Sequence, residues 1–145
     1  MELVVVVIIM GMLAGLSVPR YHKTKIRNQE KAAYRAMMMI RSAVNIYVVA
    51  EESNIPDMGN INLISAQQPA GLGISLYAID DISIACLGTG ADGDNECTAT
   101  HSDGWTLRFH ESSQQQVYCS SGDGTCPTCM DDGIDATADG CFRLD

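Results

Sequence analysis

Six cysteines carry most of the chemistry that this sequence offers, and all of them lie between residues 86 and 141. An even number of cysteines in a small, acidic, loop-rich module predicts a disulfide framework formed in an oxidising compartment. Six cysteines can pair in many ways, and the residues alone do not choose among them. The pairs that we favour are Cys86–Cys97 across a hairpin-sized loop, Cys119–Cys141 between the last strand and the sheet, and a local Cys126–Cys129 bridge.

The segment Cys126-Pro127-Thr128-Cys129 also has the spacing of a metal-binding or redox-active pair. Zinc would need four of the six thiolates. A redox-active pair would need a helix N-terminus and a thioredoxin-like βαβ setting, and neither is evident around these cysteines. Haem attachment would need a histidine where Met130 stands. We therefore expect structural disulfides, with zinc and redox chemistry as the alternatives.

Two acidic stretches have the oxygen-rich character of calcium-binding loops. The oxygen donors are Asp92, Asp94 and Glu96 in the first stretch and Asp131, Asp135 and Asp139 in the second. An EF-hand loop would need Gly where Cys97 stands and Glu where Asp103 stands, so the motif does not match. We interpret both stretches as solvated surface loops and expect no metal site.

Residue types that serve catalysis are few and scattered. The histidines His22, His101 and His110 are far apart in sequence, and no G-x-S-x-G, H-E-x-x-H or P-loop motif occurs. We expect no catalytic residue, no cofactor and no enzymatic activity.

The charge of the chain is divided sharply along its length. Residues 1–52 hold seven Lys/Arg and four Asp/Glu, a formal +3, whereas residues 53–145 hold two against fourteen, a formal −12. Phosphate contacts need Lys and Arg, so no specific nucleic acid partner is expected for the acidic part. The split is typical of a solvated acidic head on a basic stalk, and it also allows the stalk and head of different copies to attract each other.

The first element that must position these residues is a long N-terminal helix. Residues 3–18 carry no charge, and as a helix the segment 1–19 would span roughly 28 Å, close to the thickness of a bilayer. A signal peptide would need a basic region first, where Glu2 stands, and a buried core helix would need neighbours on every side. We expect residues 1–19 to be a transmembrane segment or the core of a bundle of like chains.

The helix is expected to continue through residues 20–52 as an amphipathic half. Pro19 should kink or loosen the helix without ending it, because helical signals resume at once, and Ser53 to Pro56 should stop it. One apolar stripe recurs at the helical period. Its members are Ile26, Ala33, Met37, Ile40, Val44 and Val48.

Residues 53–145 are expected to form one small head. A short helix is predicted around residues 61–67, and β-prone segments predict strands at 75–79, 82–87, 105–110, 115–119 and 141–144. Successive short strands favour an antiparallel sheet whose apolar face packs on the helix stripe. The sequence therefore predicts an α+β fold, with a long N-terminal helix against a small antiparallel sheet with disulfide-tied loops.

The N-terminal residues resemble a known family. Residues 2–21 read ELVVVVIIMGMLAGLSVPRY, in which Glu2, the apolar run, Gly11 or Gly15, Pro19 and Tyr21 all stand at the spacing found in type IV pilins and related pseudopilins. In that family a short leader is cleaved before an N-methylated residue, and three or four residues normally precede the acid. Here Met1 alone precedes Glu2.

The resemblance implies the pilin fold and a structural role. It implies a filament subunit held in the bacterial inner membrane and then polymerised with copies of itself. The six cysteines and the short strands favour the hypothesis of a major pilin, which a pilus assembly machinery would build into an extracellular pilus for adhesion, motility or surface attachment. Glu2 would neutralise the N-terminal amine of a neighbouring subunit, and Pro19 and Tyr21 would belong to the same assembly segment. The alternatives are a pseudopilin of a type II secretion system and a DNA-uptake pilin.

Overall fold

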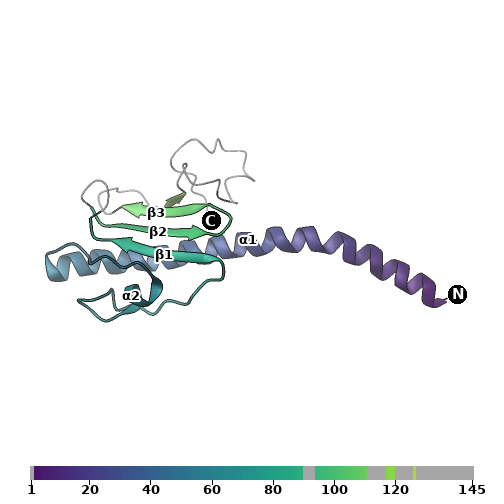
Figure 1. The fold of residues 1–145 in the computed structure, drawn as a ribbon, viewed down its shortest axis with the longest axis horizontal. Helices are drawn as coiled ribbons and strands as arrows, with labels where there is room; N and C mark the ends of the chain where they lie inside the picture. Colours follow the sequence, from purple (N-terminus) through teal and green to yellow (C-terminus); the bar gives the residue numbers. More distant parts are fainter. Residues whose placement is uncertain (1, 90–93, 111–116, 120–125, 127–145) are drawn as a thin grey trace.

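The structure, a computed structural model, describes residues 2–89, 94–110, 117–119 and 126, and at positions 2 and 14–20 it describes the backbone only. Its dominant element is the helix α1 (Glu2–Glu51), which runs through Pro19 without interruption. The prediction that Pro19 does not end the helix is therefore confirmed. Figure 1 shows α1 lying along the head with its C-terminal part and curving gently away from it with its N-terminal part.

The described strands form one antiparallel sheet in the order β1-β2-β3-β4. The strands are β1 (Ile82–Leu87), β2 (Glu96–His101), β3 (Thr106–His110) and β4 (Tyr118–Cys119). In the register, Cys86 lies opposite Cys97 and Cys97 lies opposite Phe109. The sheet is therefore a meander in which each strand pairs with the next along the chain.

The core lies between α1 and one face of this sheet. Ala33, Met37, Ile40 and Val44 of α1 are fully buried, which confirms the middle of the predicted stripe, whereas Ile26 and Val48 at its ends are half-buried. Their partners from the sheet alternate along each strand, as a sheet with one covered face requires. These are Ile84, Cys86, Cys97, Ala99, Leu107 and Phe109. The α+β architecture, a long helix packed on an antiparallel sheet, is thus observed.

A short helix and a close backbone approach connect α1 to the sheet. Helix α2 (Ile61–Ser65) begins after Asn60, whose Oδ1 accepts hydrogen bonds from the N–H groups of Asn62 and Leu63, the usual arrangement at a helix N-terminus. Further along, the outer edge of β1 is covered at Cys86, which exchanges two backbone hydrogen bonds with Met58.

The prediction of a strand at residues 75–79 is wrong. This segment forms no strand, although Ile74, Leu76 and Ile79 are half-buried against the core while Ser75 and Tyr77 are exposed. An extended segment that packs on a core shows the same alternation of buried and exposed side chains as a β-strand. The sequence pattern therefore did not reveal that this segment has no hydrogen-bonded neighbouring strand in the described part of the chain. The strand β2 was not predicted at all, because Cys97-Thr98-Ala99-Thr100 follows an acidic loop and holds few bulky apolar residues.

Two disulfides are present in the described part of the chain. Cys86–Cys97 joins directly opposed residues of β1 and β2, as predicted. The second bond joins Cys119 to Cys126, so the predicted Cys119–Cys141 and Cys126–Cys129 pairs are wrong. Cys126 is buried against β3, with its Sγ 3.9 Å from the carbonyl oxygen of Thr106, which brings it beside the end of β4. Cys129, Cys141 and the predicted strand at 141–144 lie outside the described residues. Of the strand predicted at 115–119 the structure describes residues 117–119, and the last two of these form β4.

Candidate subunit interface

The most unusual surface of the molecule is the N-terminal part of α1. Every large apolar side chain from Leu3 to Leu13 is between 50% and 78% exposed. At about 100° per residue, eleven successive positions cover all sides of a helix, so this exposure has no preferred face. Soluble monomers rarely expose contiguous apolar surface of this extent, and such a patch marks a site of interaction. Figure 1 shows that this segment extends well beyond the head.

The sequence-predicted assembly residues fall on this same helix. Glu2 is the first residue of α1, and Pro19 lies within it, with only their backbone described. The side chain of Tyr21 is 75% exposed. It lies at a groove of about 440 Å³ between α1 and residues 78–80, with Lys25 and Asp80 among its lining residues. Tyr21 is therefore available to a neighbouring molecule at the point where the helix leaves the head.

A search of the described residues for a helix sufficiently long and apolar to cross a membrane finds none.

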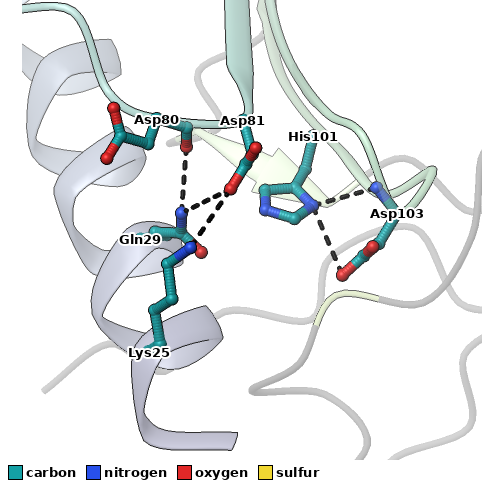
Figure 2. A network of polar contacts seen from close by, with 6 residues as sticks. All are labelled: Lys25, Gln29, Asp80, Asp81, His101 and Asp103. Atoms are coloured by element: carbon teal, nitrogen blue, oxygen red, sulfur yellow. Dashed lines mark hydrogen bonds and ion pairs between the residues drawn. The ribbon is translucent and has the colours of Figure 1, made fainter. Parts of the chain in front are cut away.

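A network of polar contacts holds the head to α1 at this same point (Figure 2). The Gln29 side-chain amide donates hydrogen bonds to the backbone oxygen of Asp80 at 3.0 Å and to Oδ2 of Asp81 at 3.2 Å. Lys25 Nζ lies 3.4 Å from the same Oδ2. The hydrogen bonds from Gln29 and Lys25, together with the charge of Lys25, lower the pKa of the Asp81 carboxyl.

The network continues from Asp81 into the sheet. The Asp81 backbone has a φ of 66°, a conformation that few residues other than glycine and Asn or Asp adopt readily, and its carbonyl accepts a hydrogen bond from Ser102 N–H at 2.9 Å. Next to it, Nδ1 of the buried His101 accepts a hydrogen bond from Asp103 N–H at 3.0 Å, and its ring stacks on Trp105 at 4.8 Å. Sequence analysis missed this site, because it is built from single polar residues far apart in the chain.

The calcium candidates do not come together in the described residues. Glu96 is buried, and its Oε1 lies 3.4 Å from an Arg108 nitrogen and 3.9 Å from a His110 nitrogen, so a basic pair occupies this carboxylate. Asp94 is half-buried, and Asp92, Asp131, Asp135 and Asp139 lie outside the described residues. Within the part that the structure describes, no group of three His, Cys, Asp or Glu side chains is arranged to hold a metal ion.

Comparisons with known proteins add no family or relative. No protein-family model matches the chain, and neither a curated protein nor a solved structure shows significant similarity to it.

Proposed function

We propose that this chain is the major subunit of a type IV pilus, a structural protein that polymerises into a helical filament. The observation that carries the proposal is the exposure of every large apolar side chain from Leu3 to Leu13 on a helix that extends beyond its own head. The resemblance of residues 2–21 to the pilin N-terminus and the helix-on-sheet architecture of the head support it.

The size of the apolar surface makes self-association energetically reasonable. Ten large apolar side chains are exposed between residues 3 and 13. At about 1.5–3 kcal/mol for each side chain fully removed from water, leaving water would supply roughly 15–30 kcal/mol, whether the segment enters lipid or a bundle of like helices. Between lipid and such a bundle this contribution largely cancels, and close packing and specific contacts would favour the bundle. A surface that is apolar on all sides cannot be covered by one partner helix. It is covered when several helices surround it, which is the geometry of a filament core.

The roles of individual residues follow from this packing. A carboxylate at Glu2, surrounded by apolar helices, would need a cationic partner, and the N-terminal amine of a neighbouring copy is a suitable one. Before assembly the same apolar segment would be held in the bacterial inner membrane. The acidic head, stabilised by disulfides that form in oxidising compartments, would make the outer surface of an extracellular pilus.

The proposal is tested by electron microscopy of material sheared from cells that express the full chain. Long surface filaments containing this protein are expected, and their absence under conditions of strong expression would contradict the proposal. Short filaments confined to the periplasm would instead favour a secretion pseudopilin.

The assembly role of Glu2 is tested separately by Glu2→Ala, with Glu51→Ala at the exposed far end of α1 as the matched control. Glu2→Ala should reduce filament yield while leaving the amount of membrane-associated protein unchanged. The control should assemble normally. A normal filament yield from Glu2→Ala would refute the role assigned to this carboxylate.

A further inference from the structure

The side of α1 that faces away from the sheet forms a second exposed surface, which we call the outer face. It consists of Lys31, Arg35, Met39, Ile46 and Val49. Met39, Ile46 and Val49 are 51%, 64% and 80% exposed, whereas Met37 and Val44 on the covered side are fully buried. The outer face is therefore basic toward the N-terminus and apolar toward the C-terminus. No contact within the described residues covers it.

The described part of the head in the same molecule does not reach the basic end of this face. At about 100° per residue, Lys25 lies roughly 90° around the helix from the centre of the buried row, and there it contacts Asp81 of its own head. Lys31 and Arg35 lie about 150–170° from that centre, on the opposite side of the helix. Lys25 thus pairs with the head of its own molecule, whereas Lys31 and Arg35 lie on the side of α1 that the described part of the head does not cover.

A surface of matching charge lies at the base of the head. It consists of Asp80 and Asp103, which we call the acidic base. Their sequence neighbours are hydrogen-bonded to each other, because Ser102 N–H donates to the Asp81 carbonyl. Both side chains of the acidic base are exposed, that of Asp103 by 57%, although one oxygen of the Asp103 carboxylate also lies 3.6 Å from Nδ1 of His101. Figure 2 shows the Asp80 carboxylate turned away from Gln29 and Lys25, so it is open to a partner. Asp81, between them in the network, is already engaged by its own helix.

We propose that the outer face of α1 binds the acidic base of a second copy of this chain, with Lys31 and Arg35 paired to Asp80 and Asp103. This rests on the proposed function, since it places the contact between subunits of one filament. Exposed ion pairs contribute little individually, but complementary charges fix orientation and register. Met39, one turn beyond Arg35, would exclude water beside its pair, and Ile46 and Val49 would extend the apolar contact toward the C-terminus of α1.

The test uses charge reversal on both sides of the contact in the full chain. Lys31→Glu with Arg35→Glu, and separately Asp80→Lys with Asp103→Lys, should each raise the critical concentration for filament assembly about tenfold at about 0.1 M salt. The effect should shrink at about 1 M salt, where charges are screened. The quadruple variant, in which both surfaces are reversed, should assemble like the wild type.

Two controls separate the contact from net charge. Introducing glutamate at four exposed polar positions away from both surfaces lowers the formal charge as much as the Lys31 and Arg35 reversals do, and should leave assembly unchanged. Lysines at these same positions should fail to rescue Lys31→Glu with Arg35→Glu. The positions are Ser53, Asn54, Asn62 and Gln67.

The outcomes distinguish this inference from the function on which it rests. A wild-type chain that forms no filaments would overturn the proposed function. A wild-type chain that assembles, with both reversed pairs assembling equally well, would overturn the contact alone, as would failure of the quadruple variant to recover while its melting temperature equals that of wild type. If Lys31→Glu with Arg35→Glu lost binding to anionic vesicles but kept assembly, the occupant would be lipid and the assigned partner would be wrong.

Discussion

Two methionines two residues apart on α1 provide a direct test of which side of the helix packs on the head and which side is left for the proposed filament contacts. Met37 is fully buried in the core, whereas Met39 is 51% exposed on the outer face. Met37→Ala removes a buried side chain and leaves a cavity, which should lower the free energy of unfolding of the head by about 2–5 kcal/mol. Met39→Ala removes the same atoms from a half-solvated position and should change it by less than about 0.5 kcal/mol.

The assay is urea unfolding of the full chain in detergent, followed by the fluorescence of Trp105, which is buried in the core of the head. The midpoint should fall markedly for Met37→Ala and remain at the wild-type value for Met39→Ala, with equal slopes for all three proteins. Filament yield should respond to Met39→Ala even so, because its surface would be buried only between copies. Equal losses of unfolding free energy from the two substitutions would refute the assigned orientation of α1.

Three further predictions concern the head. Replacing Cys86 and Cys97 together by serine should lower the free energy of unfolding by about 2–3 kcal/mol, because the closed loop is short, and denaturant unfolding under non-reducing conditions measures it. The lowered pKa of Asp81 means that its contribution to stability is present above the ordinary pKa of 3.8 and is lost as pH falls through the lower value of the folded state; Asp81→Asn should remove this part of the acid dependence of unfolding, and an unchanged acid profile would count against it. Gly88→Ala should prevent correct folding, because an added Cβ would meet the backbone carbonyl oxygen of Ile55; a melting temperature like that of wild type would contradict this contact.

The parts of the fold that were predictable are those that produce a periodic pattern among residues close together in the sequence. The buried row on α1 follows from apolar residues at helical spacing, and β1 and β3 follow from β-prone runs bounded by turn residues. Cys86–Cys97 was also predictable, because a hairpin-sized loop brings its ends together. Each of these features depends on residues near one another in the sequence, so the pattern contains the information.

The features that sequence reasoning missed depend on tertiary placement. Cys126 pairs with Cys119 because it is buried against the backbone of β3, and spacing along the chain does not encode that neighbour. The network of polar contacts between α1 and the head joins Gln29 to Asp80 and Asp81, which are about fifty residues away in the sequence. A single glutamine on a basic helix is usually a solvent-exposed residue, so no local sequence signal identified Gln29 as part of a contact with the head.

The position of this network bears on the register in which the head packs on α1. The chain passes within a few residues from the end of α1 at Glu51 to Met58, which pairs with Cys86 of β1, so the head has to pack near the C-terminal half of α1. Within that reach, apolar packing along residues 33–44 is not directional and does not by itself fix the register. Polar contacts are directional, and the amide of Gln29 has to meet both the Asp80 carbonyl and the Asp81 carboxylate in one register. If the head shifted by a turn toward the N-terminus, these groups would lose their partners. The network therefore helps to fix the register of the head on the amphipathic part of α1.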